Sequence, residues 1–233
     1  MSRIGGVVEA IVKSVDDPEN LGRIQVRFPW LEDAIGYWAR VAAPMAGKNR
    51  GCFLMPEVDD EVLVAFDHGD VAHPYVVGYC WSKPDTPPFS VDPHKRGIKS
   101  VSGHELIFDD NAGSSPTITL TTQGGFELLL DEGGGRVTLA TASGVTLELN
   151  DAPPQAQVML PTGDTITLDS TGLDVTVAGE VNVTALTATI TAPAVTIDAA
   201  ATSITGVLDV AGAVLSAGGV VSPTYTPGVG NLL

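Results

Sequence analysis

Apolar and polar residues alternate with a period of two along most of the chain, which is the pattern of β-strands. In the first eighty residues, stretches of this kind are short and are separated by segments rich in Gly, Pro, Asp and Asn. The alternating stretches are 8–12, 24–28, 62–66 and 75–81. Around five strands in so short a region favour a small closed barrel, because closure leaves no strand edge unpaired. We therefore expect a barrel domain over residues 1–83.

From residue 116 the apolar residues come as pairs two positions apart, followed by a break at Gly, Pro, Asp or Ser. The spacing between pairs is about eight to ten residues at first and six to seven after Val175. Regular repeats of this length are typical of solenoids and repeat arrays. The expected pairs are Ile118/Leu120, Leu128/Leu130, Val137/Leu139, Leu147/Leu149, Val158/Leu160, Ile166/Leu168, Val175/Val177, Val181/Val183, Ala188/Ile190, Val195/Ile197 and Leu208/Val210.

Each repeat offers only two apolar side chains to an interior, so one chain alone encloses little. Three chains wound around a common axis would share these thin apolar stripes and would give every edge strand a partner. The pattern thus predicts an all-β protein in which the barrel is followed by an interwound trimeric β-helix, a β-prism needle, over residues 101–233. Residues 84–100 belong to a stretch with several prolines and are expected to form a stiff, extended linker.

Charge is distributed unevenly and limits the classes of partner. The net charge is −16, and residues 101–233 contain a single cation, Arg136, against 14 carboxylates. Binding to nucleic acid or to anionic lipid depends on Lys and Arg, so we expect neither partner. No apolar run is long enough to span a membrane, and the N-terminus does not resemble a secretory signal. The expected site of synthesis and assembly is the cytoplasm, without stable membrane anchoring.

The residues that could perform chemistry are concentrated in the first half. Asp59, Asp60, Glu61, Asp67 and Asp70 lie close together in sequence, with His68 and His73 among or next to them. We interpret them as solvated turn residues at strand ends, because acid–base and metal sites need groups that converge from defined faces. The sequence contains no GxSxG, HExxH or phosphate-binding glycine loop, so we predict no catalytic, cofactor or metal site. Cys52 and Cys80 are expected to be reduced and buried.

Four tracts resemble the central spikes of contractile tails. These are "GRIQVRFPW" (22–30), "YWARVAAPMAGKNRG" (37–51), "PEVDDEVLVAFDHGDVAHPYVVG" (56–78) and "SGHELIFDD" (102–110). They are similar to the OB domain, and to its passage into the needle, in phage baseplate assembly protein V and the VgrG spikes of type VI secretion. One departure is Asp59, where related sequences often have Gly before the "DEV" run; Asp tolerates the left-handed backbone region better than most residues.

The resemblance implies a homotrimeric needle in a tail baseplate, of a phage or a related injection particle, that pierces the target envelope when the sheath contracts. It implies no enzymatic activity, since the connector is too short for the lysozyme domain of some relatives. Because the chain starts at the barrel, the baseplate hub that binds this OB domain is expected to be another polypeptide.

The resemblance also bears on the C-terminal tip. Spikes that end in their own point often hold iron through an HxH motif, and no histidine follows His104. A PAAR-type tip protein is therefore expected to cap the needle at the C-terminus, with Tyr225, Pro227, Leu232 and Leu233 as its apolar contacts.

Two other functions fit a β-solenoid. Hexapeptide-repeat acyltransferases are trimeric left-handed β-helices, but they have one aliphatic position every six residues and a histidine in or near the coils. A surface adhesin or ice-binding array would use the outward threonines, although its threonine ladder needs a flat, strict register that these irregular breaks do not favour. Binding of acyl-CoA would support the first alternative, and the lack of neighbouring tail genes the second.

Overall fold

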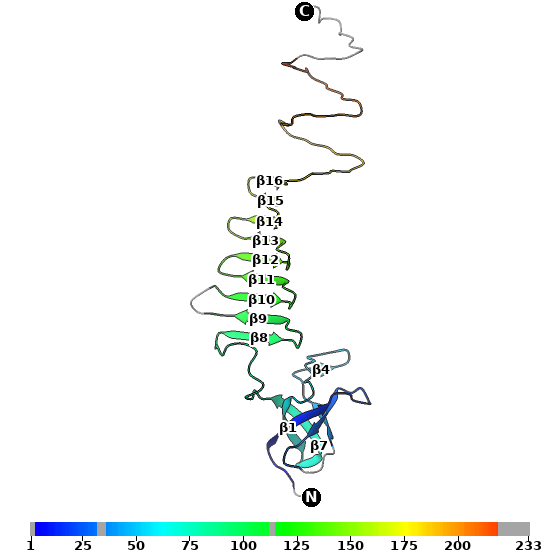
Figure 1. Ribbon diagram of the computed structural model, residues 1–233, viewed down its shortest axis with the longest axis vertical. Helices are drawn as coiled ribbons and strands as arrows, with labels where there is room; N and C mark the ends of the chain where they lie inside the picture. The colour runs from blue at the N-terminus through cyan, green and yellow to red at the C-terminus, as the bar shows by residue number, and fades with distance from the viewer. Residues whose placement is uncertain (1–2, 32–35, 112–114, 219–233) are drawn as a thin grey trace, which may run out of the picture. The chain divides into compact units, whose positions relative to one another are not determined.

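The computed structural model describes residues 3–31, 36–111 and 115–218, and in these residues the regular secondary structure is entirely β. The first group of strands closes into a five-stranded barrel in the order β1-β2-β3-β7-β6 (Figure 1). All its neighbours are antiparallel except β3 and β7, which are parallel. The barrel strands are β1 (Val7–Ser14), β2 (Arg23–Arg27), β3 (Tyr37–Val41), β6 (Glu61–Asp67) and β7 (Asp70–Tyr79). A partly open five-stranded Greek-key barrel is the architecture of the OB fold.

Alternate residues of these strands point into the barrel and form its core. Ile24 and Val26 of β2 and Val64 of β6 are fully buried. The core consists of Ala10, Val12, Ile24, Val26, Phe28, Ala39, Val62, Val64, Phe66 and Val76. Burial of each such side chain contributes about 1.5–3 kcal/mol, so this interior stabilises the domain without any second layer.

The alternating stretch 75–81 overlaps β7, which begins earlier, at Asp70, and ends at Tyr79. Pro74 and Val76 are the buried residues of β7, whereas Val77 and Tyr79 are exposed. The register between β6 and β7 shifts between Leu63 and Val64, as at a β-bulge. At such a shift one extra residue interrupts the alternation, so the residues that face inward differ on its two sides.

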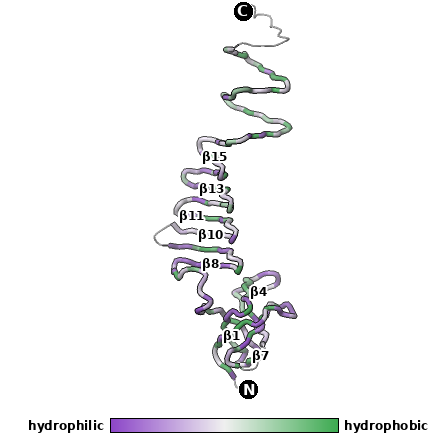
Figure 2. Tube along the Cα trace, viewed as in Figure 1, coloured by the Kyte–Doolittle hydropathy of each residue, from purple (hydrophilic) through white to green (hydrophobic). Residues whose placement is uncertain are grey.

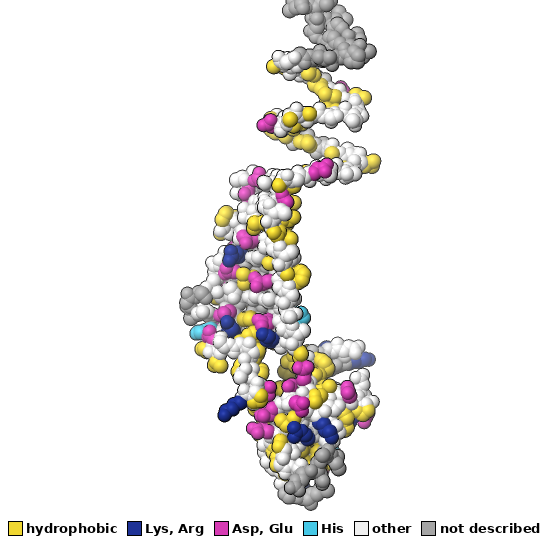
Figure 3. All heavy atoms as spheres, in the orientation of Figure 1, with side chains coloured by type: hydrophobic (Ala, Val, Ile, Leu, Met, Phe, Trp, Pro, Cys, Tyr) yellow, Lys and Arg dark blue, Asp and Glu magenta, His cyan; other side chains and the backbone are white. Residues whose placement is uncertain are grey.

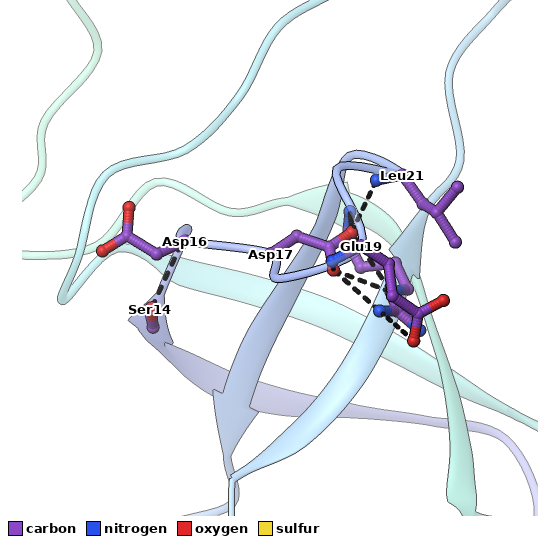
Figure 4. A network of polar contacts seen from close by, with 6 residues as sticks. Ser14, Asp16, Asp17, Glu19 and Leu21 are labelled. Carbon is purple, nitrogen blue, oxygen red and sulfur yellow. Dashed lines mark hydrogen bonds and ion pairs between the residues drawn. The ribbon is translucent and has the colours of Figure 1, made fainter.

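The loop between β1 and β2 is organised by one carboxylate, that of Asp17 (Figure 4). It accepts hydrogen bonds from the backbone N–H groups of Glu19, Leu21 and Arg23, and from the guanidinium of Arg23 with Nη2···Oδ1 at 2.7 Å. The hydrogen bond from Arg23 is the main cause that holds the pKa of Asp17 well below its usual range. The loop therefore keeps a fixed conformation while Asp17 is ionised.

Two smaller features of the barrel can be compared with expectation. Asp59 has φ 77°, the left-handed conformation proposed for it, in the turn before β6. Cys52 and Cys80 are both exposed, so the expectation that they are buried was wrong. Cys52 directly follows β5 (Arg50–Gly51), which pairs with β4 (Ala46–Gly47) as a short hairpin. Cys80 directly follows the last residue of β7.

The second group of strands forms one antiparallel sheet in which each strand pairs with the next along the chain, from β8 to β16. We call this sheet the meander. It begins at Lys95, so its first strand lies within the range 84–100 that was expected to be a linker. Its strands are β8 (Lys95–Lys99), β9 (Glu105–Asp109), β10 (Thr117–Thr121), β11 (Glu127–Asp131), β12 (Arg136–Ala140), β13 (Thr146–Asn150), β14 (Gln155–Met159), β15 (Thr165–Asp169) and β16 (Leu173–Thr176).

The turns on one side of the meander repeat a single design. In each of the segments 100–104, 122–126, 141–145 and 160–164, the first and fifth residues share a backbone hydrogen bond, and the fourth donates to the first. The fourth residue is always glycine, with φ between 84° and 91°. This is the three-residue hairpin with glycine in the left-handed conformation, so these glycines set the register of the sheet.

Residues 182–233 form a second unit, described over 182–218. In that range there is no regular strand, and every residue is exposed. The chain bends at 186, 193, 200, 205–206, 211–212 and 217–218, which reproduces the spacing of six to seven residues in the sequence. Figure 1 shows this segment as an open trace that passes back and forth without a neighbouring strand.

Candidate assembly surface

One face of the meander carries two columns of apolar side chains. Register places Leu120 opposite Leu106 and Leu128, while Ile118 lies opposite Phe108 and Leu130. The first column is Ile98, Leu106, Leu120, Leu128, Leu139, Leu147, Val158, Ile166 and Val175. The second is Phe108, Ile118, Leu130, Val137, Leu149, Ala156, Leu168 and Leu173. We call these two columns the apolar face.

The expected pairs were correct for β10 to β13 and for β15, and wrong at two strands. In β14 the pair on the apolar face is Ala156 and Val158, since Leu160 lies beyond the strand in the following turn. In β16 the pair is Leu173 and Val175. Cross-strand pairing sets the register, so a small residue such as Ala156 takes the position that the search for large apolar residues passed over.

In several strands of the meander the apolar residues are more exposed than the polar ones, the opposite of what is usual in a folded protein. Along β10, β13 and β15 the polar positions are half-buried and the apolar positions between them are exposed. Leu120 is 46% exposed, Leu139 49% and Ile166 48%. Figure 3 shows hydrophobic side chains at the surface of these strands. A soluble protein rarely leaves so long an apolar surface uncovered, so this face is a candidate interface.

The opposite face is mostly polar, although Ile107 and Leu129 also lie on it, and it makes hydrogen bonds within the chain. The Gln157 side chain donates to the Thr167 hydroxyl at 3.0 Å, between two neighbouring strands. Asn150 donates to Glu148 at 2.8 Å. At the first two strands, Lys99 pairs with Glu105 at 2.7 Å. Several polar groups of this face are thus satisfied within the chain, although the Thr146 hydroxyl is buried without a hydrogen-bond partner.

A groove follows the second apolar column. Its floor contains Phe108, Ile118 and Leu130, and its rim contains Asp131 and Arg136, whose Oδ2 and Nε lie 3.4 Å apart. Asp131 also accepts hydrogen bonds from the Ser115 hydroxyl and, at 2.8 Å, from the N–H of Gly134. The Ser115 hydrogen bond is the main cause that lowers the pKa of Asp131. These contacts hold the side chain of Asp131 in place beside the apolar floor of the groove.

We expect acid to destabilise the meander through Asp131. Its folded-state pKa is lowered, so its contribution is complete above the unfolded value near 3.9 and is lost as the pH falls through the folded value. Thermal unfolding of wild type and Asp131→Asn between pH 7 and pH 2 measures this. The variant should melt lower than wild type at pH 7, and the two should converge toward pH 2. A difference in melting temperature between the two proteins that stays constant with pH would contradict this role of Asp131.

The second unit offers a further apolar surface. Along 182–218 the larger aliphatic residues Val, Leu and Ile recur between smaller or polar residues, chiefly alanine and threonine (Figure 2). Ile190 is 77% exposed and Val195 58%. No part of this segment has an interior of its own, and its backbone has no strand partner within the described residues.

The other candidate residues do not converge on a site. Asp70 and His73 contact each other at 3.1 Å on the exterior of the barrel, and His68 lies 3.7 Å from Asp67 at an exposed turn. No group of three or more His, Cys, Asp or Glu residues able to hold a metal ion occurs in the part of the chain that the structure describes. Over the same residues, no helix has the length and hydropathy needed to cross a membrane. The proposed tip contacts Tyr225, Pro227, Leu232 and Leu233 lie outside the described residues.

The chain is similar to one known domain family and to several longer proteins. Residues 8–81 match the type VI secretion system/phage-baseplate injector OB domain family. The type VI secretion system spike protein VgrG3 of Vibrio cholerae is 32% identical over 125 residues, which is 48% of this chain and 12% of that protein. A second V. cholerae protein, actin cross-linking toxin VgrG1, is 31% identical over 122 residues, 47% of this chain and 11% of that protein.

The spike protein VgrG1a of Pseudomonas aeruginosa is 31% identical over 111 residues, 41% of this chain and 17% of that protein. The matched region thus spans less than a fifth of the length of these three relatives. The family match over residues 8–81 includes three of the four tracts that suggested the resemblance, 22–30, 37–51 and 56–78, and nearly all of the five-stranded barrel. Residues 8–81 are therefore an injector OB domain of the type VI secretion system/phage-baseplate family, and about half of the chain is similar to VgrG spike proteins.

Proposed function

We propose that this chain forms the central spike of a contractile-tail baseplate, as a homotrimeric needle that pierces the target envelope when the sheath contracts. The action is mechanical and requires no catalytic residue. The injector OB domain over residues 8–81 and the likeness to VgrG spike proteins support the general role. The trimer and the piercing action rest on the arguments that follow.

The single observation that carries the proposal is the reversed exposure of the meander. Its apolar face is the more exposed one, with Leu120, Leu139 and Ile166 each about half exposed in one chain. Three such faces turned toward a common axis would bury the apolar columns and leave the polar faces in water. Burial of apolar surface contributes about 25 cal/mol per Å², so long columns provide ample association energy.

Charge supports a shaft that stays in solution. Residues 101–233 have a net charge of −13, from 14 carboxylates and one arginine, so three copies would have about three times that charge. A rod with this charge is repelled by other acidic surfaces and keeps its copies from aggregating. The particle is then tail-associated, and no nucleic acid is among its partners.

Two further partners complete the proposal. The OB barrel is the part that would seat the trimer on a baseplate hub protein. A PAAR-type tip protein would cap the C-terminal end through Tyr225, Pro227, Leu232 and Leu233. No cofactor or metal is required for either contact.

The test uses contractile particles from cells that produce the chain and from cells in which its gene is deleted. We expect the chain in purified wild-type particles, at three copies per tail. Its absence should abolish leakage of periplasmic enzymes from target cells, and complementation with the wild-type gene should restore it. Full leakage caused by particles that lack the chain would contradict the proposal.

A further inference from the structure

A second groove, unlike the rest of the protein in its charge, lies on the outside of the barrel. It is formed by β2, β3, the start of β7 and the loop between β1 and β2, and its volume is about 760 Å³. In OB folds generally, the face of the second and third strands and the loops beside it bind ligands. Although the chain has a net charge of −16, none of the described residues that line this groove is Asp or Glu. We call it the arginine groove.

Strand pairing sets two arginines and two aromatic rings side by side in the arginine groove. Arg40 of β3 lies opposite Arg23 of β2 on one side and opposite Tyr75 of β7 on the other. The Cζ atom of Arg40 lies 5.7 Å from the centroid of the Tyr75 ring, and that of Arg23 lies 5.6 Å from the centroid of the Trp38 ring. Cation–π attraction acts at these distances, so each guanidinium is held over its ring.

The cations of the groove differ in whether their charge is balanced within the chain. Arg23 pairs with Asp17 at 2.7 Å and with Glu19 at 3.0 Å, and His73 contacts a carboxylate of its own strand at 3.1 Å. Arg40 is exposed, and it has no ion pair in the part of the chain that the structure describes. A guanidinium over a ring keeps its edge N–H groups available for a carboxylate, in the paired geometry that arginine favours.

We propose that the arginine groove binds a carboxylate-bearing segment of another polypeptide, and that Arg40 is the residue that receives the carboxylate. This inference rests on the proposed function, in which that polypeptide is the baseplate hub, and it names the surface and the chemistry of the contact. Arg, Trp and Tyr are the residues that most often dominate the affinity of protein interfaces. The charged side chains of the groove are all cationic, so charge complementarity favours an acidic segment.

Nucleic acid, which many OB folds bind, fits this groove less well. Single strands bind through bases that stack on open aromatic rings. Here Trp38 and Tyr75 are half-buried, and each already has a guanidinium over one face of its ring. The net charge of −16 also repels phosphate. An acidic protein segment needs only the edge of the Arg40 guanidinium and can lie along the rest of the groove.

Incorporation into contractile particles tests the proposal. Wild-type, Arg40→Glu and Lys83→Glu chains are produced in cells that lack the native gene, and the amount of chain in purified particles is measured. We expect Arg40→Glu to lower this amount about tenfold or more, as expected when one partner of an interfacial charge pair is lost. Lys83→Glu makes the same change of charge at an exposed residue that does not line the groove, and it should match wild type.

A second groove variant guards against a folding defect. Ala72 is exposed and lines the groove, so Ala72→Glu adds a carboxylate there while Arg40 stays in place. We expect the same loss from particles as for Arg40→Glu. Wild-type amounts of Ala72→Glu would overturn the inference even if Arg40→Glu failed to fold. By light scattering both variants should keep the mass of wild type, since a lower mass would mean that the groove binds a second copy of this chain and not another polypeptide.

The outcomes separate this inference from the proposed function. If the wild-type chain is present in particles and both groove variants are present in equal amounts, only the inference fails. If the wild-type chain is absent from particles, the proposed function fails, and the hub contact fails with it.

Photo-cross-linking in assembled particles identifies the occupant. Benzoylphenylalanine is placed at residue 72 of the full-length chain, and the cross-linked segment is sequenced by mass spectrometry. We expect a segment that contains Asp or Glu, from a protein other than this chain. A cross-link to nucleic acid, to another copy of this chain or to a segment without carboxylates would refute the assignment, as would the lack of any cross-link.

Discussion

Replacement of Leu120 by aspartate is expected to convert the protein from trimer to monomer. Leu120 lies on the apolar face, between Leu106 and Leu128 of the neighbouring strands, and is 46% exposed in one chain. Removal of an apolar contact of this size costs about 1.5 kcal/mol per chain. Three copies thus lose about 4.5 kcal/mol, a shift of roughly a thousandfold in the association equilibrium. Burial of three carboxylates adds to this loss.

Thr119→Asp is the matched control for that experiment. Thr119 is the preceding residue of β10, points to the polar face and lies opposite Ile107 and Leu129. The same charge at that position should leave the trimer intact, as measured by light scattering at equal protein concentrations. If both variants remain trimeric, or both dissociate, the apolar face is not the interface.

Proline at residue 189 is expected to have the second large effect. In one chain Thr189 is exposed and its backbone belongs to no strand, so proline there would cost little. In an interwound segment it removes one backbone donor from each of three chains, and each carbonyl left without its donor costs about 1–3 kcal/mol. Thr189→Pro should therefore lower the melting temperature of the trimer and abolish its resistance to mild detergent.

The control for this variant is Thr189→Ala, which removes the hydroxyl but keeps the backbone N–H. Thermal unfolding and detergent resistance of the alanine variant should match wild type within a few degrees. A proline variant that also matches wild type would show that residues 182–218 do not pair between chains.

Sequence alternation predicted the barrel and most of the meander because each depends on a local pattern. The strand over 24–28 and the pairs of β10 to β13 come from side chains that alternate between two faces, a property that sequence records directly. Where pairing overrides the pattern, prediction failed. In β14, Ala156 was missed because it is small, and Leu160 was chosen although it lies in the following turn.

Asp164 could not be singled out from sequence, because its backbone contact, the N–H of Ala178, lies fourteen residues later. Its only local signal is that it follows the glycine of a repeated turn, a position that His104 also occupies. The exposure of Cys52 and Cys80 was missed for a similar reason. Cysteine is buried on average, but these two residues lie just after the ends of strands, in connecting segments, where they are exposed.

The measurement that tests the central claim most directly is the absolute mass of the purified full-length protein by light scattering. The chain has a mass of 24.1 kDa, and the account predicts a particle of about three times that mass at all practical concentrations. A mass of 24.1 kDa that does not change with concentration would contradict the shared apolar core and, with it, the trimeric needle.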